Sequence, residues 1–187
     1  MTTEPRKQHW VSWAALASAA ATLVVILLFV EHAKSSDFRK AAEWHKVHGN
    51  VIVVDGHKLT LPQDWWEKDP PEGGNRVVVK ATRSLLKAWQ AGIILGRKGP
   101  NEAEEDEDGI RKHLEMFIEI ENKGKQTPIS SLVVVNAAST KIYCKKAVIV
   151  EPMVELRCDV VGAPTLITSV GLPNTVEGVE RIISTFE

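Results

Sequence analysis

The stretch Lys141–Val161, KIYCKKAVIVEPMVELRCDVV, has the pattern of an antiparallel β-hairpin. Its second half alternates apolar with charged residues, as expected for a strand that buries one face. A turn centred on Glu151 and Pro152 gives a register in which Cys144 lies opposite Cys158. The Cβ atoms of directly opposite residues are about 4.5–5.5 Å apart. The stretch therefore predicts a mainly antiparallel sheet.

The two cysteines of this hairpin are the only ones in the chain, and the register places them within disulfide range. We expect a Cys144–Cys158 disulfide; the alternative is a pair of buried, reduced thiols that act as small hydrophobic residues. A disulfide implies an oxidising compartment, and therefore a folded domain outside the cytosol. Two cysteines also exclude a cysteine-rich scaffold and a four-cysteine metal site.

The amino-terminal stretch Trp10–Val30 contains no charge, proline or glycine. As a helix it spans roughly 31 Å, which is close to the hydrocarbon thickness of a bilayer. We therefore expect one transmembrane helix over residues 10–31. Retention as an anchor is favoured over cleavage as a signal peptide, because Glu31 follows the apolar run where a small-x-small cleavage site would stand.

Two features of this region bear on partners and orientation. Ala14, Ser18 and Thr22 recur every fourth residue, which allows a weak self-association in lipid, although an alanine-rich helix also gives this spacing by chance. The basic residues that flank the apolar run slightly favour a cytosolic carboxyl-terminal domain, whereas the cysteines favour the opposite side. We expect a single-pass protein of a bacterial inner membrane with an extracytoplasmic domain.

Length and charge limit the remaining possibilities. The chain has 187 residues and a net charge of −1, which suits one domain with an appendage and lacks the basic excess of a dedicated nucleic-acid binder. We expect a short tail over residues 1–9, the transmembrane helix over 10–31, a juxtamembrane helix or linker over 32–50, and a compact α+β domain over 51–187.

Local patterns within residues 32–187 predict further elements. The Asp55-Gly56 dipeptide predicts a two-residue turn between strands at 51–54 and 57–61. We expect other strands at 76–82, 93–95, 132–135 and 165–170. Helices are expected at 36–48, at 109–122 and after Asn174, which with Glu177 resembles a capping box. The fold class is α+β: a mainly antiparallel sheet with helices packed against it, preceded by one transmembrane helix.

Two stretches carry a resemblance to a known family. Lys58–Trp65, KLTLPQDW, is similar to the early strand–proline–tryptophan signature of PsbP-like domains. Val176–Phe186, VEGVERIISTF, resembles the closing helix of the same group, whose members are small α/β/α sandwiches of photosynthetic and many other bacterial envelope proteins. The resemblance implies assembly or scaffolding through docking onto other proteins, without conserved chemistry to carry over.

Candidate chemistry along the chain is sparse. His45 and His48 lie at i, i+3 with His57 nearby in sequence, but local residues do not supply a full zinc ligand set, and a solvated helix explains them better. The acidic run at 101–108, NEAEEDED, lacks the spacing of a calcium loop and is expected to precede a helix, whose amino-terminal end favours negative charge. We expect no catalytic residue, cofactor or metal.

These observations favour a membrane-anchored, non-catalytic interaction or assembly domain of the cell envelope. The expected partners are the lipid bilayer and an unidentified membrane or envelope protein, and no nucleic acid. Trp65 and Trp66 are the candidate docking surface, because tryptophan is often a docking anchor. The alternatives are an envelope hydrolase with a site assembled from residues distant in sequence, and a small-ligand or lipid-binding domain.

Overall fold

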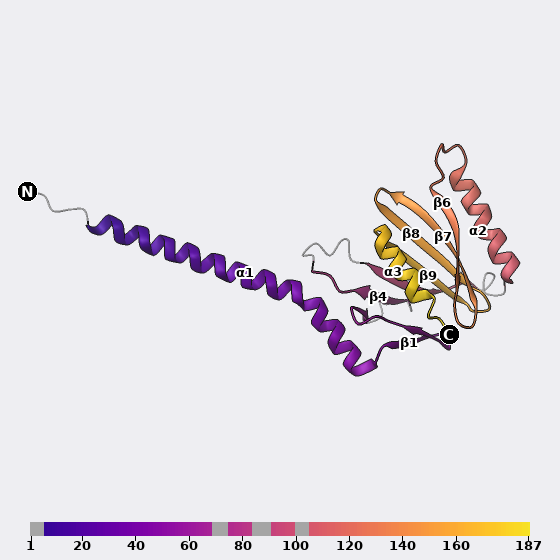
Figure 1. The fold of residues 1–187 in the computed structure, drawn as a ribbon, viewed down its shortest axis with the longest axis horizontal. Helices are drawn as coiled ribbons and strands as arrows, with labels where there is room; N and C mark the ends of the chain where they lie inside the picture. Colours follow the sequence, from indigo (N-terminus) through magenta and orange to yellow (C-terminus); the bar gives the residue numbers. More distant parts are fainter. Residues whose placement is uncertain (1–5, 69–74, 84–90, 100–104) are drawn as a thin grey trace, which may run out of the picture.

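A long first helix leads into a mainly antiparallel α+β fold (Figure 1). The computed structural model describes residues 6–68, 75–83, 91–99 and 105–187. The elements follow in the order α1 (Arg6–His48), β1 (Val51–Val54), β2 (His57–Thr60), β3 (Trp65–Lys68), β4 (Arg76–Lys80), β5 (Gly92–Arg97), α2 (Glu107–Asn122), β6 (Ser130–Asn136), β7 (Lys141–Val150), β8 (Met153–Val160), β9 (Thr165–Gly171) and α3 (Pro173–Ile183). The predicted fold class is confirmed.

Helix α1 is continuous over 43 residues, so the apolar stretch and the expected helix at 36–48 form one element. Its amino-terminal part extends away from the sheets, and only its carboxyl-terminal part lies against them (Figure 1). Within α1, the part Ala15–His48 contains an 18-residue window with a mean hydropathy of 2.0 and no buried residue, so the helix is long and apolar enough to cross a membrane. The helix ends at His48, because the next residue, Gly49, has a φ of 75° in the left-handed region that glycine adopts without strain.

The strands form two antiparallel sheets. One has seven strands in the order β3-β4-β5-β9-β8-β7-β6, and the other is the β1-β2 hairpin. The predicted register of β7 and β8 is confirmed, with Cys144 opposite Cys158. The predicted turn between β1 and β2 is also confirmed, because Asp55 and Gly56 have φ angles of 48° and 89°. Strand β3 was not predicted.

The main core lies on one face of the seven-stranded sheet. Helix α3 and the β1-β2 hairpin cover this face, and α3 contributes its apolar stripe. Because successive strand residues point to opposite faces, the core takes every second residue of each strand. The central side chains are fully buried: Ile93, Leu156, Ile167, Val179 and Ile183.

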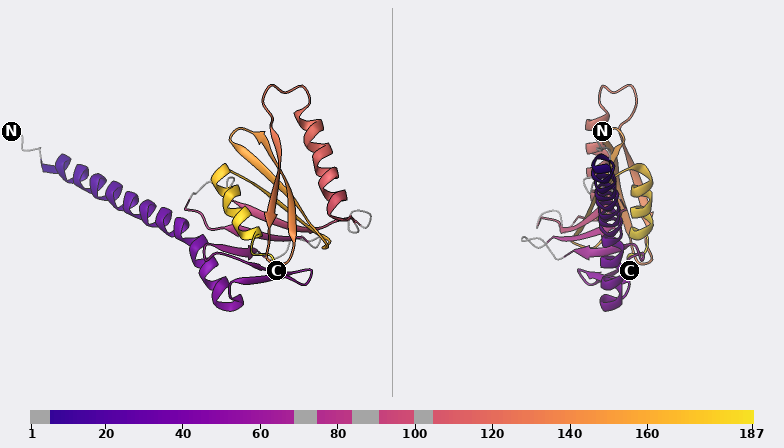
Figure 2. Two further views of the ribbon diagram at one scale, coloured as in Figure 1. Left: turned by 45° about the vertical axis from the view of Figure 1, so that its right-hand side comes forward. Right: turned by 90° about the vertical axis from the view of Figure 1, so that its left-hand side faces the viewer.

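The opposite face of the sheet is covered at its two ends. Helix α2 packs on β6 and β7, where Ile110 and Leu114 contact Tyr143. The carboxyl-terminal part of α1 packs near β3, where Ala41 contacts Trp66 and belongs to a second small cluster. Figure 2 shows α2 and α3 on opposite sides of the sheet.

The beginnings of α2 and α3 differ from the predictions. Helix α2 starts at Glu107, two residues earlier than expected, because the Asp106 carboxylate caps it by accepting from Gly109 N at 2.8 Å. Helix α3 starts at Pro173, and no side chain caps it, so the capping box at Asn174 is wrong. The fixed φ of proline is favourable at the first helical position, and this sets the start.

Two further features concern α2 and the acidic run. Helix α2 packs on the sheet only through the stripe that contains Ile110 and Leu114, so 42% of Phe117 is exposed. Glu121 pairs with Lys145 of the sheet. Residues 101–104 of the acidic run lie outside the described residues.

Candidate functional site

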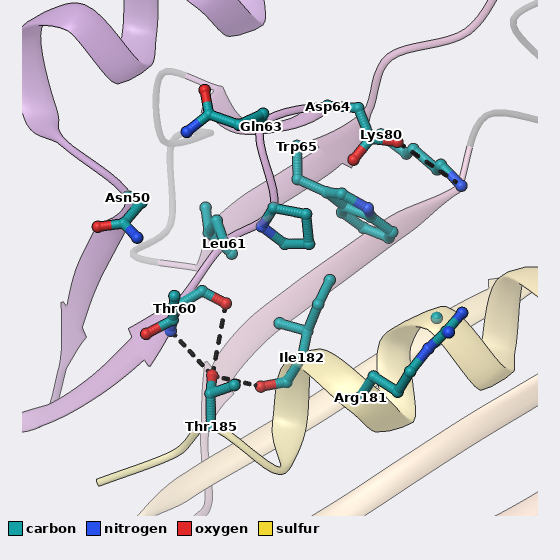
Figure 3. Close-up of a pocket in the computed structure, with 12 residues that line it drawn as sticks. Asn50, Thr60, Leu61, Gln63, Asp64, Trp65, Lys80, Arg181, Ile182 and Thr185 are labelled. Atoms are coloured by element: carbon teal, nitrogen blue, oxygen red, sulfur yellow. Dashed lines mark hydrogen bonds and ion pairs between the residues drawn. The ribbon is translucent and has the colours of Figure 1, made fainter.

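A groove of about 580 Å³ lies between the segment after β2, the end of β4 and α3 (Figure 3). Apolar lining comes from Leu61, Pro62, Trp65 and Ile182. Asp64 and Lys80 form an ion pair at 3.7 Å, and Arg181 extends from α3 across the groove from this pair. The groove therefore combines apolar contact area with charged groups of both signs.

The two tryptophans predicted as an exposed docking surface are buried, so that prediction is wrong. Trp65 is 3% exposed and Trp66 is 6% exposed. As neighbours in β3 they point to opposite faces of the sheet, and a different layer covers each of them. Trp65 belongs to the main core, and Trp66 packs with Ala41 of α1. Only Trp65 contributes to the groove.

Hydrogen bonds between β2 and the carboxyl-terminal end fix one side of the groove. The backbone groups of Lys58 and Glu187 form a reciprocal pair at 2.8 and 2.9 Å. The Thr60 N–H donates to Thr185 Oγ1 at 3.0 Å, as Figure 3 shows. These contacts hold the strand that precedes Leu61 against the end of α3, although about 125 residues separate them.

The turn of the β1-β2 hairpin is fastened to the large sheet. Asp55 Oδ1 accepts from Arg97 at 2.9 and 2.6 Å, and Oδ2 accepts from Thr165 Oγ1 at 2.9 Å. Partial burial opposes ionisation of Asp55, but these hydrogen bonds outweigh it and lower the pKa of the carboxyl group. The carboxylate thus keeps the hairpin in place beside the groove. The turn was predicted from the sequence, but its partners were not, because they lie 42 and 110 residues further along the chain.

His45 joins the end of α1 to the groove segment. Its Nδ1 lies 2.7 Å from Gly49 O, and its Nε2 lies 3.0 Å from Pro62 O and 2.8 Å from Trp65 O. The residue is only 9% exposed. The ring therefore bridges the last turn of α1 and the start of β3, which fixes the direction in which the long helix leaves the domain.

The other histidines considered as metal ligands lie in separate environments. His48 stacks on Trp44 with ring centroids 5.0 Å apart, and His57 stacks on Phe186 at 4.8 Å. Among the described residues, no group of three or more His, Cys, Asp or Glu side chains is arranged to hold a metal ion.

A second cavity of about 170 Å³ lies between α2 and strands β7 and β8, and charged side chains line it. Glu121 pairs with Lys145, and Asp159 pairs with the buried Lys98 at 3.4 Å. Burial opposes ionisation of Glu121, but the hydrogen bond and the charge of Lys145 lower its pKa. A general acid or base works best with a pKa near the operating pH, so this ionised carboxylate is suited to ion pairing rather than to proton transfer.

The two cysteines lie in the main core, with no exposed surface. They form a disulfide that joins β7 to β8. Neither cysteine lines the groove, so the bond acts on the sheet rather than on the site.

No family model and no curated protein matches this chain. Among solved structures, the solution structure of cyanobacterial PsbP (CyanoP) from Synechocystis sp. PCC 6803 is similar, with a TM-score of 0.42 and 12% sequence identity. The similarity covers 73% of this chain and 90% of that chain. The chain thus has a weak PsbP-like resemblance, as the stretches Lys58–Trp65 and Val176–Phe186 indicated.

Proposed function

We propose that this chain is a single-pass, membrane-anchored, non-catalytic interaction domain of the bacterial cell envelope, with its folded part on the extracytoplasmic side. The observation that carries the proposal is the form of α1. One end of this helix is apolar and exposed, and the other end is fixed in the fold. Such a helix is suited to hold a domain at a membrane.

The exposed apolar end of α1 favours insertion in lipid. Leu23, Val25 and Phe29 are 58%, 64% and 72% exposed, and their neighbours are similar. Each Leu, Ile, Val or Phe at the centre of a membrane helix contributes about 0.3–0.6 kcal/mol to insertion. The ten such residues between Val11 and Val30 therefore supply roughly 3–6 kcal/mol.

The fixed end of α1 supports an interaction role. The His45 contacts and the packing of Ala41 on Trp66 join the helix to the domain, so the groove has a defined position relative to the apolar end. Tethering raises the local concentration of a domain near a partner in the same membrane. The partner that fits is a protein that presents both apolar and charged side chains, because the groove offers the exposed Pro62, Arg181 and the Asp64–Lys80 pair.

The extracytoplasmic placement is supported by the disulfide between β7 and β8, because disulfides persist in oxidising compartments. A reporter cysteine tests this placement. We expect Val47→Cys, at a position that is 76% exposed, to react with a membrane-impermeant maleimide in spheroplasts when Cys144 and Cys158 are replaced by alanine. Labelling only after lysis would contradict the placement.

Membrane retention tests the tether itself. We expect the full chain to resist carbonate extraction, and Val25→Arg combined with Leu27→Arg to release it, because each arginine costs about 2.5–3.5 kcal/mol at the centre of a membrane helix. Val47→Arg is the control, because it places an arginine on the same helix outside the apolar run. Wild-type protein in the soluble fraction, or retention of the double variant, would overturn the proposal.

Site-specific photocrosslinking tests the groove. A photoreactive residue at the exposed groove position Gln63 should crosslink in native membranes to one protein, and Arg181→Glu should abolish that crosslink. The same photoreactive residue at the exposed position Lys112 of α2 is the control and should not give this product. Equal products from both positions would refute docking at the groove.

A further inference from the structure

The outer edge of strand β6 lacks the features that usually protect a sheet edge. The two end strands of the large sheet are β3 and β6. Strand β3 has four residues, includes Glu67 and Lys68, and lies against α1. Strand β6, SSLVVVN, has seven residues without a charge or a proline, and its register with β7 is regular throughout. Proteins usually blunt exposed edges with charges, proline, bulges or short strands, because a bare edge pairs with other chains.

The pairing with β7 shows which backbone groups of β6 face outward. Val148 N donates to Ile129 O at 2.8 Å, so Ile129 belongs to the residues that hydrogen-bond to β7. In an antiparallel pair these residues alternate with residues that point their N–H and C=O groups the other way. Given the register of β6 and β7, the outward set is Ser130, Leu132, Val134 and Asn136.

A side chain already occupies the first outward position in the manner of a neighbouring strand. Asn122 Nδ2 donates to Ser130 O at 2.8 Å, and Asn122 Oδ1 accepts from Ser130 N at 3.0 Å. An added strand would form the same pair of hydrogen bonds with the N–H and C=O groups of every second residue along the edge. Within the described part of the chain, no such partner is bonded to the outward groups of Leu132, Val134 and Asn136.

A shallow surface depression of about 540 Å³ runs along this edge, between β6 and α3. The consecutive residues Val133, Val134 and Val135 all line it. Their side chains alternate between the two faces of the sheet, so the depression follows the edge of the strand rather than one face. On the α3 side, Glu177 and Arg181 line the depression, and neither forms an ion pair within the described residues.

We propose that the outer edge of β6 binds an extended segment of a partner protein by strand addition. Main-chain hydrogen bonds join the segment to Leu132, Val134 and Asn136, which is the general mode of β-augmentation. Alternate side chains of the segment meet different surfaces. One set is polar and faces Glu177 and Arg181, and the other set is apolar and lies beside Leu132 and Val134. This surface goes beyond the proposed groove and does not depend on what binds there.

The charges beside the edge favour a different protein over a second copy of this chain as the occupant. A second copy would pair through the same uncharged strand, so its β6 would offer Glu177 and Arg181 no side chain of opposite charge. A segment that carries polar or charged residues at alternate positions would meet both groups. The occupant is therefore a segment of a different protein.

The test uses the full chain in detergent micelles and a synthetic peptide with the sequence of residues 141–148 and the change Cys144→Ser. This sequence already pairs with the other edge of β6. We expect saturable binding and at least tenfold slower hydrogen exchange at the amides of Leu132, Val134 and Asn136. The amides of Val133 and Val135, which already bond to β7, should not change. A peptide of scrambled sequence is the control for binding to the micelle.

Two variants complete the test. Val134→Pro removes an outward N–H without removing a bond to β7, and Val134→Lys places a charge on the edge. Both should weaken peptide binding at least tenfold, whereas Ile120→Lys, at an exposed position of α2, should not. All three variants should remain in the membrane fraction. Loss of peptide binding can therefore be distinguished from loss of the membrane anchor. The proposal is overturned if the peptide protects none of the three amides, if Val134→Lys binds it normally, or if the free chain is a dimer with those amides already protected.

Discussion

Replacing Asp55 by asparagine tests whether one carboxylate holds the β1-β2 hairpin beside the groove. The Asp55 side chain is 11% exposed and accepts hydrogen bonds from Arg97 and Thr165. Its φ of 48° lies in the left-handed region, which asparagine also tolerates, so the variant removes the charge without adding strain.

The expected loss of stability follows from these contacts. A hydrogen bond to a charged group contributes about 1.5–3 kcal/mol when it is well shielded. The Arg97 side chain is 76% exposed, so solvent reduces its share of the stabilisation. Asparagine also keeps one acceptor oxygen. We therefore expect Asp55→Asn to lower the free energy of unfolding by about 1–2 kcal/mol at neutral pH.

The pH dependence gives a second check with a definite sign. The folded-state pKa of Asp55 lies below its ordinary value of 3.8, because the hydrogen bonds from Arg97 and Thr165 outweigh the effect of burial. Its stabilisation is therefore fully present above pH 3.8 and disappears as the pH falls through the folded-state pKa. The difference between wild type and variant should shrink to nearly zero in strong acid.

Urea unfolding of the full chain in detergent, followed by tryptophan fluorescence, measures this difference, because Trp65 and Trp66 are buried. The control is Asp108→Asn, whose carboxylate pairs with Arg111 but is 67% exposed and should contribute less than about 0.5 kcal/mol. Equal stability of Asp55→Asn and wild type at pH 7 would refute the reasoning, and so would a difference that persists unchanged in strong acid.

Three further predictions concern the sheet, the helix junction and the charged cavity. Replacing Cys144 and Cys158 by alanine should lower the free energy of unfolding by roughly 3 kcal/mol, as loop-closure entropy gives for a loop of this size; a urea midpoint equal to that of the oxidised wild type would contradict this. His45→Ala should remove the bridge between Gly49 O and the β3 segment and so increase protease cleavage near residue 49. Limited proteolysis with mass spectrometry measures this cleavage. An unchanged cleavage pattern would show that the ring does not fix the junction between α1 and the domain. Lys145→Met should leave Glu121 without its cation and lower the free energy of unfolding by about 1–3 kcal/mol at pH 7. The loss should be smaller at pH 4, where the carboxyl group of Glu121 can take up a proton. A loss that does not depend on pH would exclude this ion pair as the cause.

Sequence patterns predicted the hairpins well because their determinants are local. The Asp55-Gly56 dipeptide has the stereochemistry of a two-residue turn, and the alternation in β8 fixes which face is buried. The same alternation placed Cys144 opposite Cys158 in the correct register. In each case the partners lie within about twenty residues of one another, so few other arrangements of the segment compete.

The candidate site was predicted poorly because it depends on contacts between distant segments. The composition of β3 suggested a tryptophan docking surface, but α1 and α3 bury one tryptophan each. No local sequence pattern indicates which layer covers which face of the sheet. The groove likewise forms only when Lys80 and Arg181, which are about a hundred residues apart in the sequence, lie on either side of it. Arg181 is one polar residue among others on the polar face of α3, so the sequence does not indicate that it lines a groove.

The apolar run of α1, the antiparallel hairpins and the opposed cysteines were determined by the sequence itself, since periodicity and turn stereochemistry act between near neighbours. The burial of Trp65 and Trp66, the groove beside Arg181 and the place of β6 at the edge of the sheet were decided only by the tertiary structure. The order of strands in a sheet and the layers that cover its faces depend on the packing of the whole chain. A strand carries the same local pattern whether it lies at the centre of the sheet or at its edge.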